Sequence, residues 1–246
     1  MQPAVEIAQT IMSYCGPPPS PTELLSRWNF DPILLVVLAV AAAAGFRAID
    51  RTRDRQYFAG SIGLSLFLFV SPFCALGVAL FAGRSIHHLI LILGVAPLLA
   101  LAFRIRWQWD IGLGRATALQ AMTFWLWHWP AFYSAALSND ALFWLMQVSI
   151  TGSAYLFWAA LLRSEPTKAV GGLLATTVLM GALGALLTFT TRALYAPHWS
   201  STAQWDLAPI EDQQLAGLLM WAPGSLPYLL IAIAILYRSM KLPAAA

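Results

Sequence analysis

The distribution of apolar positions along the chain predicts seven membrane-spanning helices. Seven predominantly apolar runs alternate with short polar segments, and most runs are long enough to cross the ~30 Å hydrocarbon core of a bilayer. The runs cover residues 32–47, 57–75, 85–103, 116–136, 142–162, 169–190 and 213–237. Little chain remains for a soluble domain, so we expect an all-α membrane protein with one seven-helix transmembrane domain over residues 32–237.

The charges between these runs predict the orientation of the domain. Eleven of the fourteen lysines and arginines follow the first, third, fifth or seventh run. They include Arg47, Arg104, Arg106, Arg163 and Arg238. Because basic residues are enriched on the cytoplasmic side, residues 1–31 should form a periplasmic tail and residues 238–246 a cytoplasmic tail.

Composition and charge narrow the class of protein further. Hydrophobic residues make up 59% of the chain and charged residues 10%, whereas soluble domains carry about 25% charged residues. The first thirty residues lack the basic and apolar regions of a signal peptide, so we expect the tail to cross with the first helix. The net charge of +3 reflects the cytoplasmic arginines rather than a nucleic-acid surface. No internal repeat or mid-membrane charge indicates a transporter, and no nucleophile or metal cage indicates an enzyme.

The two cysteines, Cys15 and Cys74, both lie toward the predicted outer side. A disulfide is permitted there, but two cysteines alone define no disulfide framework. Burial of Cys74 as an apolar side chain is therefore the favoured interpretation, with pairing as the alternative.

All four histidines, which are His87, His88, His128 and His198, lie on the predicted outer side and indicate an imidazole site there. Adjacent residues project about 100° apart on a helix, so one of His87 and His88 should face lipid headgroups or solvent. His88 lies about one turn inside the membrane, where an imidazole needs a partner. It is therefore the better ligand candidate.

His128 is predicted to lie deeper, about 12 Å from the outer end of the run 116–136. Pro130 removes a helical donor and frees the backbone carbonyl of Leu126, and such freed backbone groups could hold the ring. A structural role is the alternative to a ligand role, although the entry of His88 from another helix favours a ligand.

Other polar residues are predicted at the outer ends of the helices. Asp31 should cap the first helix, with the orientation of a histidine as a further possibility. Glu211 and Asp212 stand at the start of the last helix, where capping is their favoured role, and Gln213 extends a polar strip inward. Met220 offers a thioether that suits cuprous copper, although packing is the commoner role of methionine.

The order of these motifs resembles that of a known family. The motifs are W-N-F-D-P from Trp28, H-H at His87 followed by A-P-L-L from Ala96, W-H-W-P-A-F-Y from Trp127, and D-Q-Q-x-x-G-x-x-M-W-x-P from Asp212. Together they resemble the polytopic CtaG family of cytochrome c oxidase assembly factors. The resemblance implies a non-enzymatic, seven-span protein of the bacterial inner membrane that helps to make a haem-copper oxidase. It further implies copper delivery or insertion at the outer face, with oxidase subunits and membrane lipid as partners.

The hypothetical copper ligands are His88, His128 and Met220, and the other polar residues of the outer-face site are His87, Asp31, Arg84, Gln147, Asp212 and Gln213. Arg84 and Gln147 stand where the family commonly has histidines, and a cation at position 84 would repel a metal ion. Two hypotheses follow. The chain is an assembly factor that handles copper, or it is a permanent accessory subunit of the oxidase that has lost metal binding.

Overall fold

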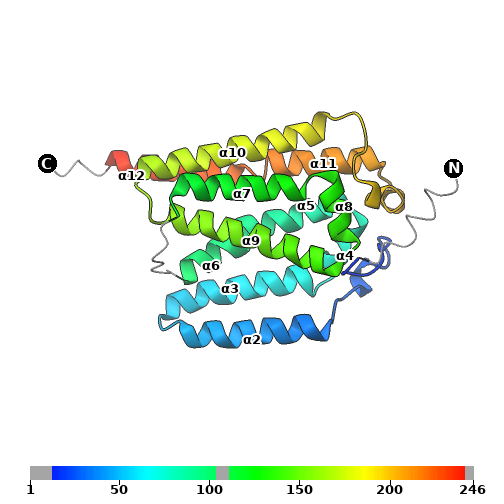
Figure 1. Ribbon diagram of the computed structural model, residues 1–246, viewed down its shortest axis with the longest axis horizontal. Coiled ribbons are helices and arrows are strands. Elements are labelled where there is room, and N and C mark those ends of the chain that lie inside the picture. The colour runs from blue at the N-terminus through cyan, green and yellow to red at the C-terminus, as the bar shows by residue number, and fades with distance from the viewer. Residues whose placement is uncertain (1–12, 104–110, 242–246) are drawn as a thin grey trace.

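The computed structural model describes residues 13–103 and 111–241, in which every regular element is a helix. The long helices lie side by side along the longest axis of the molecule (Figure 1). The α-helices are α2 (Pro32–Ala48), α3 (Thr52–Phe69), α4 (Phe73–Ala79), α5 (Phe81–Ile90), α6 (Ala96–Ala102), α7 (Leu113–Trp127), α8 (Pro130–Leu137), α9 (Asp140–Leu161), α10 (Pro166–Phe189), α11 (Pro209–Trp221) and α12 (Leu226–Lys241). Shorter elements are η1 (Leu24–Ser26), the π-helix η2 (Leu91–Val95), η3 (Ala196–His198) and η4 (Thr202–Trp205).

Four helical stretches of the described chain are long and apolar enough to cross a membrane. They are Phe81–Ala102, Asp140–Leu161, Pro166–Phe189 and Pro209–Lys241. The pair α3 and α4 supplies a fifth if it is taken as one span bent by 47°, and α2 is a shorter apolar helix. The all-helical membrane fold is thus confirmed, whereas the number of seven spans stays a prediction.

Three of the runs that the sequence predicts as single helices are broken. They are 57–75, 116–136 and 213–237, the last of which is interrupted between α11 and α12. In the first two, the break is a proline effect. In the run 57–75, α3 ends at Phe69, and Pro72 directly precedes the start of α4 at Phe73. In the run 116–136, Trp129 is extended and Pro130 begins α8. Proline disfavours the helical conformation in the preceding residue and fits the first turn of a new helix, so each of these two breaks falls directly before the new helix.

The π-helix η2 lies inside the long stretch Phe81–Ala102 and is stabilised from a neighbouring helix. In a π-helix the carbonyl of Ile92 would accept from the nitrogen of residue 97, but Pro97 has no N–H. The indole Nε1 of Trp158 in α9 donates to this carbonyl at 2.7 Å. Pro97 thus leaves a carbonyl of η2 without its helical donor, and the side chain of Trp158 supplies one. This hydrogen bond holds α9 against the middle of the bundle.

The backbones of α10 and α11 approach one another closely at two glycines. A Cβ atom on Gly217 would lie 2.6 Å from the carbonyl oxygen of Gly184, and one on Gly184 would lie 2.8 Å from the carbonyl of Gly217. Only glycine allows the two backbones to approach this far, as in other membrane helix pairs. In contrast, α2 lies at the edge of the bundle beside α3 (Figure 1).

A disulfide joins Cys15 to Cys74 and fixes the N-terminal segment to α4. Cys74 is buried as expected, but the interpretation that it stays unpaired is wrong, because residues 13–31 lie over this end of the bundle and bring Cys15 to it. Arg104, Arg106, the start of the predicted periplasmic tail and the end of the cytoplasmic tail lie outside the described residues.

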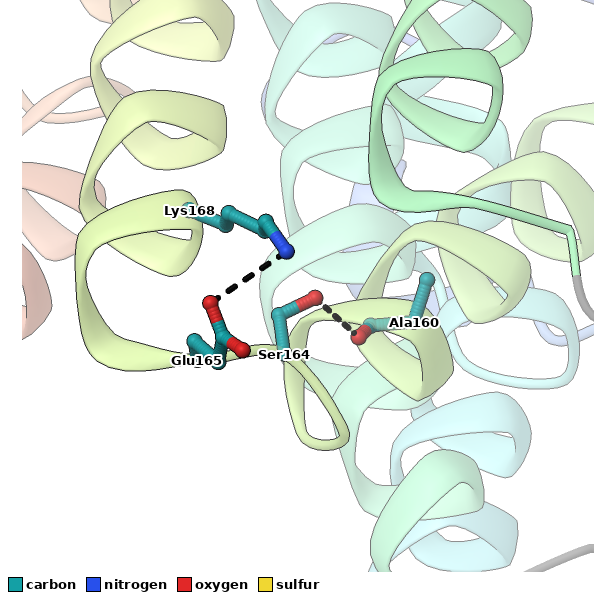
Figure 2. A network of polar contacts seen from close by, with 4 residues as sticks. All are labelled: Ala160, Ser164, Glu165 and Lys168. Carbon is teal, nitrogen blue, oxygen red and sulfur yellow. Dashed lines mark hydrogen bonds and ion pairs between the residues drawn. The ribbon is translucent and has the colours of Figure 1, made fainter.

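The loop between α9 and α10 lies at the other end of the bundle, at the left of Figure 1. There Ser164 donates to the carbonyl of Ala160 at 2.8 Å, which satisfies one of the last carbonyls of α9. Lys168 forms an exposed ion pair with Glu165 at 3.2 Å, as Figure 2 shows. This end therefore presents solvent-exposed charges, whereas the histidines lie at the opposite end.

Candidate functional site

The fold brings His88 and His128 into contact at the end of the bundle near the disulfide. His88 lies in the last turn of α5, and His128 is the residue at which α7 ends. Their ring centroids are 5.4 Å apart, with the planes nearly perpendicular. Both residues are buried, so two helices that are distant in sequence present imidazoles to one another inside the protein.

Three ring nitrogens of this pair have no hydrogen-bond partner among the described residues. They are both nitrogens of His88 and Nε2 of His128. Nδ1 of His128 lies 2.7 Å from the carbonyl oxygen of Phe124, so this nitrogen carries the proton and Nε2 is left with its lone pair. The expected partner, Leu126, instead accepts the backbone N–H of Trp129 at 3.1 Å. Unpaired buried polar atoms are costly and point to a ligand.

His87 does not face lipid or solvent, and this part of the prediction is wrong. The side chain is fully buried between two phenylalanine rings, at 5.0 Å from Phe69 and 6.2 Å from Phe73 between centroids. The reason is the bend between α3 and α4, because it places Phe73 over the face of α5 that the sequence leaves uncovered.

Arg84 is fully buried one helical turn before His88. Its Nε donates to the carbonyl of Gly77 at 3.2 Å, and its guanidinium lies 5.1 Å from the ring centroid of Phe143. A Cβ on Gly77 would lie 2.9 Å from the guanidinium carbon, so glycine provides the space for this group. The structure therefore holds a positive charge close to the imidazole pair.

Asp212 holds the start of the histidine helix. Its two carboxylate oxygens accept the backbone N–H groups of Phe81 at 2.7 Å and Ala82 at 3.0 Å. The prediction that Asp212 caps its own helix is wrong, whereas Glu211 does so by accepting the N–H of Ala208 at 2.7 Å. A negative charge at the N-terminus of α5 also interacts favourably with the helix dipole.

A second polar cluster adjoins the imidazole pair, and sequence reasoning found only its histidine, His198. His198 Nε2 lies 2.7 Å from the hydroxyl of Tyr133, and burial lowers the pKa of His198 to about 3. Tyr195 donates to the backbone carbonyl of His128 at 2.6 Å and stacks on Phe81 at 3.7 Å. Tyr133 lies within a quoted motif and Tyr195 lies three residues before His198, yet tyrosine is so frequent near membrane surfaces that its presence indicates no site.

The remaining predicted site residues lie elsewhere. Asp31 accepts hydrogen bonds from the Tyr14 hydroxyl at 2.6 Å and the Ile33 amide at 2.8 Å, which confirms its capping role and gives no contact with an imidazole. Gln213 binds the backbone of the loop between α10 and α11, accepting from Leu194 at 2.7 Å.

Met220 and Gln147 are both buried, but in different surroundings. Met220 belongs to the apolar core, and its role as a ligand stays a prediction. Gln147 lines a groove between α2 and α9. No group of three or more His, Cys, Asp or Glu side chains arranged to hold a metal occurs in the described part of the chain.

Long apolar helices that surround buried imidazoles at one end define this molecule as a multi-pass helical membrane protein. A model of the cytochrome c oxidase caa3 assembly factor family, Caa3_CtaG, matches residues 114–241. The match covers just over half of the chain, and the chain belongs to this family. It includes His128 and Met220, whereas α5 with His88 precedes it. No curated protein and no solved structure matches the chain.

Proposed function

We propose that this protein assists the assembly of a bacterial haem-copper cytochrome c oxidase by delivering or inserting copper at the outer face of the inner membrane. Membership of the assembly factor family supports the first part of this proposal. The contact between His88 and His128 supports the second part, because two imidazoles with unpaired nitrogens are suitable ligands for copper.

The site suits transfer better than storage. Two imidazoles leave a copper ion with an incomplete set of ligands, and the buried cation of Arg84 one turn away lowers the affinity for any metal ion. A factor that passes copper to an oxidase subunit must release it again. Copper is therefore a cargo, which the protein holds only until transfer.

We further propose seven crossings, with the N-terminal end periplasmic and the C-terminal end cytoplasmic. The disulfide between Cys15 and Cys74 supports this orientation, since such bonds form in the periplasm and not in the cytosol. Three exposed tryptophans at the same end, Trp28, Trp129 and Trp199, suit the interfacial belt of a membrane. In this arrangement α2, the pair α3 and α4, and the pair α7 and α8 supply the further crossings.

Labelling of single cysteines tests the orientation. Ser138 follows α8 at the histidine end and Lys168 lies at the opposite end, and both side chains are exposed. A membrane-impermeant maleimide should label Ser138→Cys in intact spheroplasts, and it should label Lys168→Cys only after lysis. The reverse pattern would overturn the proposed topology.

Copper analysis of the purified protein tests the site. Loading with cuprous ion should give a stoichiometry that His88→Ala and His128→Ala each reduce at least tenfold. His87→Ala is the matched control, since His87 is equally buried but packs on Phe69 and Phe73. Equal copper in all four proteins would exclude direct ligation by the imidazole pair.

A permanent accessory subunit of the oxidase is the alternative, and Arg84 and Gln147 favour it by replacing two expected histidines. Purification from native membranes in mild detergent distinguishes the two functions. Haem and oxidase subunits in equimolar amounts would establish the subunit, whereas protein free of haem would establish the transient factor.

A further inference from the structure

A groove between α2 and α9 forms a ligand-sized cavity outside the histidine site. Its volume is about 530 Å³, within the ~300–1,000 Å³ that small-molecule pockets usually have. Ile33, Val37 and Val148 line it and are largely exposed, so the groove opens sideways toward the hydrocarbon of the membrane. The groove is separate from the proposed copper site, because neither His88 nor His128 lines the groove.

One polar side chain inside this groove is left without a partner. Gln147 is only 2% exposed, and neither its amide oxygen nor its amide nitrogen has a hydrogen bond within the described chain. An unpaired amide in an apolar environment costs several kcal/mol. A group that both donates to and accepts from this amide would remove this cost, and a carbonyl that accepts from the amide nitrogen would remove part of it.

The outer mouth of the groove is negatively charged. Asp31 and Tyr14 line it, and hydrogen bonds from the Tyr14 hydroxyl and the Ile33 amide lower the pKa of Asp31. The carboxylate therefore carries its charge at neutral pH. No cationic side chain pairs with Asp31 in the part of the chain described, so the mouth favours a head group that carries a cation over one that carries only negative charge.

The dimensions of the groove match one leaflet of a bilayer. From Trp144 to Tyr155, both of which line the groove, α9 rises about 16 Å, which is close to half of the hydrocarbon core. Gln147 lies about 10 Å below the start of α9 at Asp140. From the membrane surface inward, the groove therefore presents the carboxylate of Asp31, then the unpaired amide of Gln147 and then an apolar channel.

We propose that this groove binds one outer-leaflet phospholipid whose head group carries a primary ammonium. The ammonium lies at Asp31, an ester carbonyl accepts from the Gln147 amide, and an acyl chain lies between Leu34 and Leu38 of α2 and Val148 of α9. The lipid would stabilise α2, which otherwise lies at the edge of the bundle beside α3.

Native mass spectrometry of the full chain tests this, after reconstitution in vesicles of equal parts phosphatidylethanolamine and phosphatidylglycerol. One phosphatidylethanolamine should remain bound to the wild-type protein. Gln147→Leu should reduce its retention roughly fivefold, because leucine cannot donate a hydrogen bond to the lipid. Asp31→Asn keeps a good helix cap and should abolish the preference for phosphatidylethanolamine over phosphatidylglycerol.

A glycine pair provides a matched test of the channel itself. Gly152 lines the groove and Gly63 in α3 does not, and an added Cβ meets nothing within 4 Å at either position. Gly152→Phe should expel the lipid while Gly63→Phe retains it, with both proteins folded by circular dichroism. Equal retention in both variants would overturn the proposal, as would equal binding of the two lipids to wild type. Retention of an uncharged isoprenoid quinone in place of phospholipid would also overturn it.

Discussion

Asp212 fixes the histidine helix through two hydrogen bonds that join residues more than 100 positions apart. Helix N-termini leave four backbone N–H groups without an intrahelical partner, and inside a membrane no water can satisfy them. At the start of α5, the carboxylate of Asp212 in α11 accepts hydrogen bonds from two of these N–H groups. The position of His88 therefore depends on Asp212, whose side chain bonds to the backbone of α5 and not to an imidazole among the described residues.

Replacement of Asp212 by alanine should destabilise the protein by about 2–4 kcal/mol, because two buried N–H groups lose their acceptor. Asp212→Asn keeps one acceptor oxygen and should cost less. Thermal unfolding in detergent measures both variants. Glu211→Ala is the control, since this neighbour makes one exposed bond and its loss should cost about 1 kcal/mol or less. Equal effects at positions 211 and 212 would contradict the role of Asp212.

His198 should make the stability of the protein depend on pH. Its pKa is lowered from about 6.5 in the unfolded chain to about 3 by burial, so below pH 6.5 the unfolded state binds more protons than the folded state. The contribution to stability is complete above pH 6.5 and is lost as the pH falls toward 3, by up to about 2 kcal/mol at pH 5.

Denaturant unfolding at pH 7.5 and pH 5 measures this loss. His198→Gln retains an acceptor for the Tyr133 hydroxyl but has no titrating group, so it should lose less stability over the same interval. An identical loss in the wild type and in this variant would show that His198 does not titrate on unfolding.

At the scale of helices, α10 and α11 depend on a close backbone contact rather than on large side chains. Gly184 and Gly217 face one another so closely that a methyl group on either would lie under 3 Å from the opposite carbonyl. The D-Q-Q-x-x-G part of the sequence motif thus has a packing explanation. Gly217 sets the distance between two helices, and Gln213 fixes the loop that joins them.

Gly217→Ala should therefore destabilise the protein, although alanine is the better helix former by about 1 kcal/mol. Gly171 in α10 is the control, because an added Cβ there meets nothing within 4 Å and Gly171→Ala should be neutral or stabilising. Differential scanning fluorimetry of both variants shows directly whether each substitution raises or lowers the melting temperature. A stabilising effect of both substitutions would refute close packing at Gly217.

The sequence predicted the helical elements better than their breaks and their partners. Hydropathy locates α9 and α10 within a few residues because both are continuous and apolar. It misses the break at His128, since an apolar run looks the same whether or not Pro130 begins a new helix. The partner of Asp212 and the groove around Gln147 depend on contacts between distant helices, which no local pattern contains.

At the scale of the whole molecule, one covalent bond connects the N-terminal segment to the bundle. The disulfide spans 59 residues and holds Tyr14 where it can bond with Asp31 at the mouth of the groove. Closing a loop of this length stabilises the folded state by up to about 4 kcal/mol. Residues 13–31, which precede α2, are therefore part of the folded unit.

The double variant Cys15→Ser with Cys74→Ser should unfold at a lower temperature than the wild type, and reducing agent should lower the melting temperature of the wild type alone. In cells, maleimide should label the wild-type cysteines only after reduction. Labelling without reduction would show that the bond does not form in the native membrane.

The hydrogen bonds from Phe81 and Ala82 to Asp212 also set an order of events during synthesis. A ribosome that adds about 5–20 residues per second needs about 7–26 s to cover the 131 residues between Phe81 and Asp212. During that interval α5 is already in the membrane with its first N–H groups uncapped. The pair of His88 and His128 reaches its final geometry only when α11 enters, so a chain truncated before α11 would present imidazoles that are not yet fixed in position.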